Sequence, residues 1–253
     1  MLDATKRVLE LYDNDEFEIF VINGKNGYGK TSYANRIIAE VYAHRDTQKW
    51  GGNGKTANWN LKLFKSHLGF HPAHVIKQWL KMKHRDYVYH WDDAGSWLNA
   101  LDYQDRFVKS VGKYLQTARS DWACIIFSAI GKEDIVNKIR SFKSCVVIDI
   151  TKEGSRPSSP YPSQRHLRTA KAYHYWSDRL GKTGTENDWE EPFDSHVPGI
   201  YEKDRNGKVV ETEGFYGWYK PLRDRYNRMN KKKTWNDLLK DKDIVESKEW
   251  VSI

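Results

Sequence analysis

Apolar positions in the first 150 residues alternate between two patterns. Mainly apolar runs of strand length occupy 17–22, 87–91, 123–128 and 145–150. Between them, apolar residues recur at helical spacing, which predicts helices over 2–12, 31–43, 72–83, 96–119 and 132–140. A shorter run at 61–64 predicts one more strand. Strands that alternate with helices are typical of a parallel sheet with crossover connections, so we predict an α/β fold.

The pattern changes after residue 150. A segment rich in Pro and Ser at 154–163 predicts an insertion or a domain boundary. Further on, Asn206-Gly207 between two short apolar runs predicts a hairpin, and a helix is expected over 219–233, after Pro221. We therefore predict a first domain over 1–152 and a small irregular C-terminal extension over 153–253, with a loop, a hairpin and a basic helix.

The most specific motif lies between the first strand and the helix that follows it. Residues 24–31 read Gly-Lys-Asn-Gly-Tyr-Gly-Lys-Thr and match the P-loop pattern, in which glycines let backbone N–H groups surround phosphates at a helix N-terminus. Lys30 is predicted to reach the β- and γ-phosphates of ATP, and the Thr31 hydroxyl to bind Mg²⁺. A chance glycine turn is the alternative, but the strand before the motif and the helix after it favour a nucleotide site. The predicted nucleotide-binding residues are Gly24, Asn26, Gly27, Gly29, Lys30, Thr31 and Ser32.

Three polar residues end the second and third core strands. Asp92 and Asp93 follow 87–91, and Ser128 closes 123–128. We expect Asp92 to hold Mg²⁺ through water, and Asp93 to orient or deprotonate the attacking water. Ser128 is predicted to contact the γ-phosphate or that water. The competing interpretations are two helix-capping carboxylates and an ordinary strand end.

Arginines provide two further hypotheses. Arg140, at the end of a short helix, is predicted to act on the γ-phosphate of a neighbouring subunit, with Arg119 as its rival. A nucleotide kinase is an alternative to an enzyme that hydrolyses ATP. Its possible lid residues are Arg156, Arg165 and Arg168. Exposed surface arginines are the plain interpretation of all of them.

His67, His71 and His74 have spacings of four and three residues, which would suit zinc on one helix face. Gly69 and Pro72 interrupt such a helix, so polar surface histidines are the favoured interpretation.

Composition narrows the class of protein. The 253-residue chain has a formal net charge of +8 and a mean hydropathy of −0.82, and no apolar run approaches the roughly 20 residues of a membrane span. We therefore expect an unexported cytoplasmic protein that has no membrane partner. Cys124 and Cys145 lie in apolar runs and are predicted to be buried free thiols.

The basic excess is concentrated near the C-terminus. Aromatic residues at 215–219 lead into a segment with seven cations and one acid, which suits nucleic acid, because rings can stack on bases and cations can pair with phosphates. The alternative is an aromatic face that docks on the core and a basic face that is merely solvated. The predicted DNA-binding residues are Lys220, Arg223, Arg225, Arg228, Lys231, Lys232 and Lys233.

The P-loop, the segment Asp-Asp-Ala-Gly-Ser-Trp-Leu at 92–98 and the spacing to 125–128 together resemble the DnaA-like AAA-type ATPases of spindle-shaped viruses of hyperthermophilic archaea, the fuselloviruses. The resemblance covers residues 15–155. It implies an AAA-like P-loop NTPase fold, with a parallel sheet of about five strands and helices on both faces. It also implies ATP and Mg²⁺ as cofactors, action as a homo-oligomer, and a role in replication or packaging of viral or plasmid DNA inside the host cytoplasm.

The chain departs from that family's pattern at two places. Asp93 stands where a glutamate is usual, so the base would be one methylene further from the water and hydrolysis is predicted to be slow. No helical lid with an arginine is recognisable after residue 155. The resulting hypothesis is an oligomeric Mg²⁺-dependent ATPase that acts on DNA. The alternatives are an ATP-switched DNA-binding protein with little turnover, and a small-molecule or nucleotide kinase.

Overall fold

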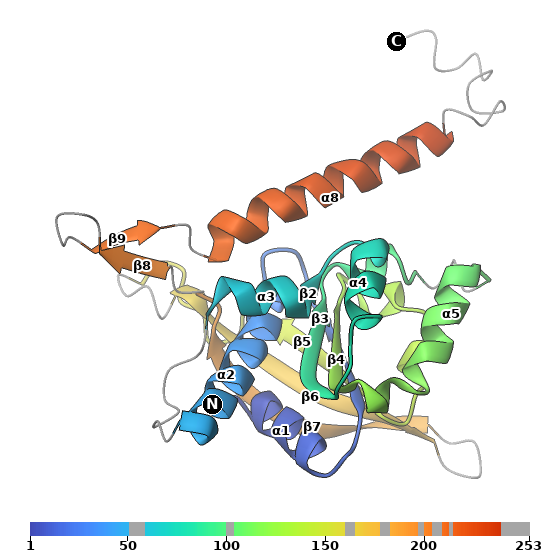
Figure 1. The fold of residues 1–253 in the computed structure, drawn as a ribbon, viewed down its shortest axis with the longest axis horizontal. Helices are drawn as coiled ribbons and strands as arrows, with labels where there is room; N and C mark the ends of the chain where they lie inside the picture. Colours follow the sequence, from blue (N-terminus) through green and yellow to red (C-terminus); the bar gives the residue numbers. More distant parts are fainter. Residues whose placement is uncertain are drawn as a thin grey trace, which may run out of the picture. The chain divides into compact units, whose positions relative to one another are not determined.

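The computed structural model describes residues 1–50, 59–99, 104–159, 165–177, 183–196, 200–203, 209–212 and 215–238. The chain divides into two compact units, Met1–Pro198 and Gly199–Ile253. The first unit contains a mostly parallel seven-stranded sheet with helices, so the α/β prediction is confirmed (Figure 1).

The sheet has the strand order β2-β3-β4-β1-β5-β6-β7. All pairs among its first five strands are parallel. These strands are β1 (Glu18–Asn23), β2 (Leu68–Gly69), β3 (Asp86–Trp91), β4 (Trp122–Ser128) and β5 (Cys145–Thr151). Their carboxyl ends therefore meet at one edge of the sheet.

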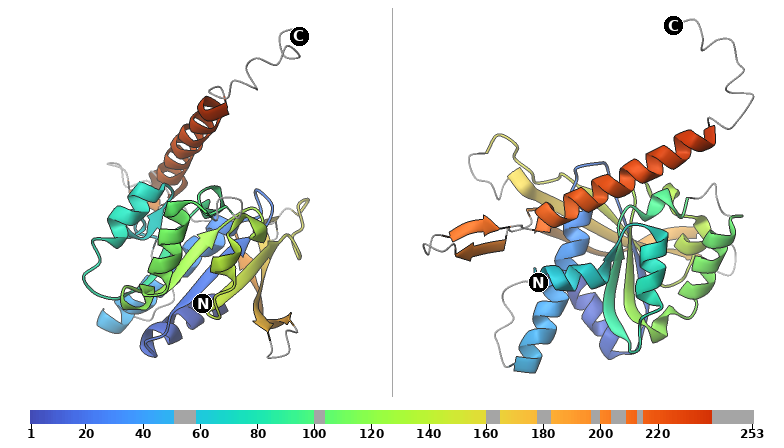
Figure 2. Two further views of the ribbon diagram at one scale, coloured as in Figure 1. Left: turned by 90° about the vertical axis from the view of Figure 1, so that its right-hand side faces the viewer. Right: turned by 45° about the horizontal axis from the view of Figure 1, so that its top comes forward.

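Helices cover both faces of the parallel strands, as predicted. On one face α4 (Pro72–Trp79) and α5 (Arg106–Leu115) pack over alternate strand residues such as Ile19 and Val21. The other face carries α1 (Asp3–Asp13) and α2 (Lys30–Trp50), which contact each other and the strands (Figures 1 and 2). The central strands are buried on both faces over most of their length, which explains why they are mainly apolar.

The two cysteines are free and buried, as predicted. Cys124 lies opposite Glu18 and Cys145 opposite Ile19, so they project from opposite faces of the sheet. Burial raises the pKa of the Cys145 thiol to about 12.

Two long antiparallel strands extend the sheet beyond β5. They are β6 (Leu167–Ser177) and β7 (Thr183–Asp194), from a region that the sequence interpretation assigns to the irregular extension after residue 152. β7 is acidic, largely exposed and contains Pro192, all of which disfavour a strand prediction. Its position at the sheet edge permits them, because an edge strand leaves one side without ladder hydrogen bonds.

Several predicted boundaries differ from the structure. Residues 61–64 form the start of α3 (Leu61–His67) rather than a strand, because Asn60 caps the helix by accepting from the Lys62 N–H. A short apolar run has no periodicity that could have separated the two cases. The helix expected over 96–119 is instead the 3₁₀ turn η1 (Ala94–Ser96), followed by α5, which Asp105 caps, and by η3 (Ala118–Ser120). Residues 132–140 form η4 (Lys132–Asp134) and α6 (Asn137–Arg140).

The second unit contains a hairpin and a basic helix, as predicted, but Asn206 and Gly207, the residues predicted to form the turn, lie outside the described residues. β8 (Ile200–Lys203) pairs with β9 (Val209–Thr212), and α8 spans Phe215–Leu238. The helix begins four residues before the predicted start and includes Pro221. In the described part of the chain, no helix is long and apolar enough to cross a membrane.

Candidate nucleotide-binding site

The glycine-rich loop joins the carboxyl end of β1 to the first turn of α2. Gly24, Gly27 and Gly29 all have positive φ, at 144°, 76° and 96°. Side-chain-bearing residues rarely adopt these angles, so the glycine pattern is a direct requirement of the loop's backbone. A Cβ at Gly24 would also approach the Ile150 carbonyl oxygen of β5 to 2.7 Å. The loop therefore has the close, glycine-dependent packing expected of a P-loop.

Lys30 begins α2 and is only 7% exposed. Its Nζ donates to the Gly24 carbonyl and, at 3.2 Å, to the Lys25 carbonyl, so the ammonium is held over the loop. A buried ammonium is stabilised only by close acceptors, and the loop's carbonyls provide them here. Phosphate oxygens could take their place.

Asp92, Thr31 and Ser128 meet at the carboxyl edge of the sheet. Thr31 Oγ1 donates to Asp92 Oδ1 at 3.0 Å, and Ser128 Oγ donates to the same oxygen. Asp92 is fully buried and follows β3, Ser128 ends β4, and Thr31 lies in α2. Three separate segments thus bring together a hydroxyl and a carboxylate that could hold Mg²⁺ directly or through water.

Asp93 has a left-handed backbone, with φ 52° and ψ 33°. Its N–H donates to Ser128 Oγ at 3.0 Å, which helps to hold this conformation. The left-handed conformation is energetically unfavourable for a non-glycine residue, and residues held in it are enriched at functional sites. Asp93 is partly exposed, as a base that must meet water has to be, and it lines a small cavity of about 200 Å³ beside Ile130.

The sequence interpretation misses His90, which joins the same network. Its Nε2 lies 3.4 Å from Ser128 Oγ and 3.5 Å from Asp92 Oδ1, and its Nδ1 lies 3.1 Å from Asn35 Oδ1 of α2. Complete burial lowers the pKa of His90 to about 4, and the nearby Asp92 carboxylate offsets only part of that effect. The imidazole is therefore neutral near pH 7. Strand periodicity could have found it, since residues two apart in a strand share a face and His90 stands two before Asp92.

A second missed contribution comes from β6 and β7. A Cβ at Gly29 would lie 2.9 Å from the Ser195 Cβ and 3.7 Å from Arg168 Cγ, so these residues lie beside the glycine loop. The sequence interpretation offers Arg168 only as a kinase lid residue. It is instead the second residue of β6 and is 8% exposed. β7 is tied to α2 as well, because the Tyr33 hydroxyl donates to Glu191 at 2.6 Å.

The two arginines considered for a neighbouring subunit's site lie elsewhere in their own chain. Arg140 Nε donates to the Ile135 carbonyl at 2.9 Å. Its positive charge offsets part of the rise that burial causes in the pKa of Cys145, the first residue of β5. Arg119 is exposed and lies 4.0 Å from the Asp15 carboxylate, just before β1. Both are near the amino ends of parallel strands, so neither reaches the P-loop of its own chain.

The three histidines considered for zinc have separate roles. His67 pairs with Asp86 at 3.1 Å, and His71 accepts from the Ala73 N–H as the cap of α4. Burial and nearby cations lower the pKa of His74. Within the described ranges, no group of three or more His, Cys, Asp or Glu side chains is arranged to hold a metal ion.

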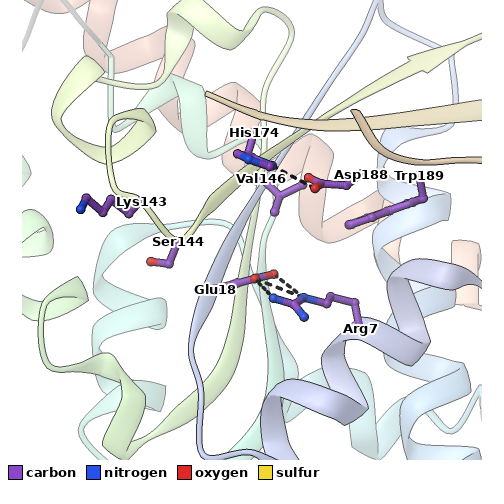
Figure 3. Close-up of a pocket in the computed structure, with 8 residues that line it drawn as sticks. All are labelled: Arg7, Glu18, Lys143, Ser144, Val146, His174, Asp188 and Trp189. Carbon is purple, nitrogen blue, oxygen red and sulfur yellow. Dashed lines mark hydrogen bonds and ion pairs between the residues drawn. The ribbon is translucent and has the colours of Figure 1, made fainter. Parts of the chain in front are cut away.

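A larger pocket of about 410 Å³ lies at the opposite edge, near the amino ends of β1 and β5. Figure 3 shows its two polar pairs, Arg7 with Glu18 and His174 with Asp188, the latter 2.9 Å apart. Asp188 is the extra residue of a β-bulge in β7. None of the predicted nucleotide or Mg²⁺ residues lines this pocket.

Comparison with known proteins gives a limited relationship. No known family model matches the chain. Over 153 residues it is 29% identical to an uncharacterised protein, B-251, of Sulfolobus spindle-shape virus 1; the match covers 60% of this chain and 58% of that protein. A KaiC-like protein from Pyrococcus horikoshii resembles the structure with a TM-score of 0.34 and 13% identity, over 77% of this chain and 91% of the other, too weakly to bear on function. The match to B-251 supports a relationship between this chain and the fuselloviruses.

Proposed function

We propose that the protein binds ATP with Mg²⁺ at the loop of residues 24–31 and hydrolyses it. The observation that carries this proposal is the contact between Thr31 at the end of the loop and the buried Asp92 at the end of β3. A chance glycine turn has no reason to meet a buried carboxylate and a strand-end serine at the edge where ligands of α/β sheets bind.

The residues fit such a nucleotide. Backbone N–H groups of the loop and the Lys30 ammonium would hold the phosphates, while Thr31 and Asp92 would hold Mg²⁺. Bound Mg²⁺ would supply positive charge that offsets the negative charge of the phosphates. Ser128 donates to Asp92 and accepts from the Asp93 N–H, so it fixes both carboxylate-bearing residues. Asp93 would orient the attacking water and accept its proton.

A direct test compares nucleotide affinity and turnover in the Lys30→Ala and Lys25→Ala proteins. Lys30 is buried over the loop, whereas Lys25 belongs to the same loop and is exposed, so it controls for loss of one positive charge. We expect Lys30→Ala to weaken ATP binding about a hundredfold or more, and Lys25→Ala to change it less than about threefold. Equal affinities in wild type and Lys30→Ala would refute the proposal.

We further propose that the ATPase acts on DNA through α8. Duplex DNA is the first form to test. The helix carries the predicted cations, and Lys220, Arg225, Arg228 and Lys231 are exposed. Lys220, Arg228 and Lys231 share one side at helical spacing. The side chains of Lys232 and Lys233 are outside the described part of the structure.

For this DNA role, Lys231, Lys232 and Lys233 should be replaced together by Gln. Phosphate contacts release counterions, so the triple variant should bind DNA more weakly and with a flatter salt dependence. The matched control replaces Lys65, Lys77 and Lys81, which are exposed lysines of the first unit. Unchanged DNA affinity and salt slope would assign the basic face of α8 to solvation alone.

The oligomeric hypothesis is tested by the dependence of turnover on protein concentration. A shared site in which Arg140 or Arg119 acts on a neighbour predicts a rate that rises more than linearly with protein. It also predicts that an Arg140→Ala or Arg119→Ala subunit lowers the rate of wild-type subunits mixed with it. Tight ATP binding without turnover or DNA response favours the nucleotide switch, and phosphate transfer to an acceptor favours the kinase.

A further inference from the structure

Arg168 is a buried cation that lies beside the phosphate-binding loop without a carboxylate partner among the described residues. It is 8% exposed, and no described acidic side chain lies within ion-pair distance of it. Burial lowers the pKa of the Arg168 guanidinium. The carboxylate of Asp194, which is beyond ion-pair distance, offsets only part of this effect. A charge removed from water in this way is costly unless an anion compensates it.

The hydrogen bonds of Arg168 leave part of the guanidinium available. Nη1 donates to Ser155 Oγ at 3.3 Å, to the Arg165 carbonyl at 3.0 Å and to the Leu167 carbonyl at 2.6 Å. Nε is buried and has no hydrogen-bond partner in the part of the chain that the structure describes. Arginine presents its donors as a planar fork suited to phosphate, so an unpaired Nε marks a place where an oxyanion would be stabilised.

The position of Arg168 next to the loop is fixed by strand pairing. In the sheet Arg168 lies opposite Phe193, whose ring is 4.8 Å from the Tyr33 ring of α2. Arg36 of α2 donates to the Asp194 carbonyl at 3.3 Å, at the end of β7. The Arg168 stem approaches Gly29 of the loop. The amino end of β6 thus lies beside the loop that follows the carboxyl end of β1.

We propose that Arg168 is a further phosphate ligand of the nucleotide, supplied by the chain's own β6. This inference rests on the proposed ATP site and adds a residue to it. The guanidinium would pair with a phosphate oxygen through Nε while Nη1 keeps its bonds to Ser155 and the Arg165 and Leu167 carbonyls. Because Nη1 donates to Ser155, phosphate binding at Nε would also stabilise the segment around Ser155. That segment should therefore become more ordered when ATP binds.

The experiment measures affinity for ATP with Mg²⁺ in four proteins: wild type, Arg168→Met, Arg168→Lys and Arg165→Met. Methionine keeps the apolar stem of Arg168 and removes its charge. Arg165 is an exposed arginine three residues away, so its variant controls for general electrostatics. We expect Arg168→Met to weaken ATP binding about ten- to hundredfold, Arg168→Lys to recover part of the loss, and Arg165→Met to match wild type.

Two further readouts separate a ligand from a structural residue. The melting temperature of Arg168→Met without nucleotide should equal or exceed that of wild type, because a buried unpaired charge is removed. Amide exchange over residues 152–159 should slow when ATP is added to wild type and stay unchanged in Arg168→Met. A lower melting temperature with wild-type ATP affinity would overturn the proposal, as would a loss confined to duplex DNA binding. If wild type itself fails to bind ATP, the proposed function fails first, and the Lys30→Ala comparison reveals it.

Discussion

Polar side chains differ in burial between the two edges of the sheet. At the carboxyl edge of the parallel strands, Lys30, Asp92 and Ser128 are buried and converge from three segments. At the amino edge, Arg7 and Glu18 form an ion pair in a pocket where they keep some exposure, 38% and 13% of their side chains (Figure 3). Both edges are rich in charged groups, but Lys30 and Asp92 are more completely removed from water than Arg7 and Glu18.

We infer from this difference that the carboxyl edge is the ligand site and that the charged groups of the amino-edge pocket satisfy one another. Burial of charged groups costs free energy, and a fold that bears this cost without full pairing is expected to recover it when a ligand binds. Among the described residues, Arg168 Nε at the carboxyl edge has no hydrogen-bond partner and its guanidinium has no ion pair, and Asp93 has a left-handed backbone. Arg85 Nε at the amino edge also has no hydrogen-bond partner there, but its guanidinium pairs with Asp15 at 3.3 Å. At the amino edge His174 is already placed between Asp188 and Glu186, at 2.9 and 3.5 Å. We therefore expect chemistry at the carboxyl edge and structural stabilisation at the amino edge.

Removal of one carboxylate charge at each edge gives the largest predicted difference in the ATP hydrolysis rate. Asp93→Asn should lower the ATP hydrolysis rate about 100- to 10,000-fold, because the base for the attacking water is lost, while ATP affinity changes little. Glu18→Gln, at the amino edge, should leave both quantities at the wild-type level. Steady-state hydrolysis and equilibrium ATP binding measure the two effects. A normal rate in Asp93→Asn would remove Asp93 from the mechanism.

Two loop glycines sharpen the comparison within the carboxyl edge. Gly27 and Gly29 both have positive φ, but a Cβ at Gly27 meets nothing within 4 Å, whereas one at Gly29 meets Ser195 at 2.9 Å. Alanine at either position adds backbone strain of roughly 1 kcal/mol or more, and only Gly29→Ala also pushes the loop from β7. Gly29→Ala should therefore lower both the melting temperature and the ATP affinity more than Gly27→Ala. Equal effects would mean that β7 does not support the loop.

The parts that could be predicted from the sequence are those encoded by neighbouring residues. The glycine loop is one continuous segment, and β1, β3, β4 and β5 are mainly apolar because most of their residues are buried. The meeting of Thr31 with Asp92 could also be expected, since carboxyl ends of parallel strands share an edge.

The missed parts depend on contacts between distant segments. Arg168 reaches the loop only because β6 pairs antiparallel with β5, and the edge strand that follows carries Pro192 and many acids. His90 is a polar residue inside an apolar run, and its role requires Asn35 from α2 and Ser128 from β4. Local pattern can neither pair an edge strand nor name the partners of a buried imidazole.

A pH change tests the burial of the carboxyl-edge network through His90. Its folded-state pKa of about 4 is below its ordinary value of 6.5, so the unfolded chain binds the extra proton between these values. Stability that this group contributes is complete above about pH 6.5 and is lost as the pH falls towards 4, by about 1.4 kcal/mol for each pH unit in that window. Urea unfolding at about pH 7 and about pH 4.5 should show a smaller loss in His90→Gln than in wild type. Equal losses would mean that the imidazole is solvated.

The smallest effect is expected at the amino edge, from the ion pair of Arg7 with Glu18. Glu18 accepts from both Nε and Nη2 of Arg7, which raises the pKa of the guanidinium, but Arg7 remains more than a third exposed and solvent screens the pair. A double-mutant cycle of Arg7→Met and Glu18→Gln should therefore give a coupling free energy of about 1 kcal/mol or less in unfolding experiments. The coupling should shrink at high salt, and neither variant should alter ATP affinity. A coupling of several kcal/mol, or a change in ATP affinity, would mean that the amino edge also bears buried, functionally linked charge, and the contrast between the two edges would not hold.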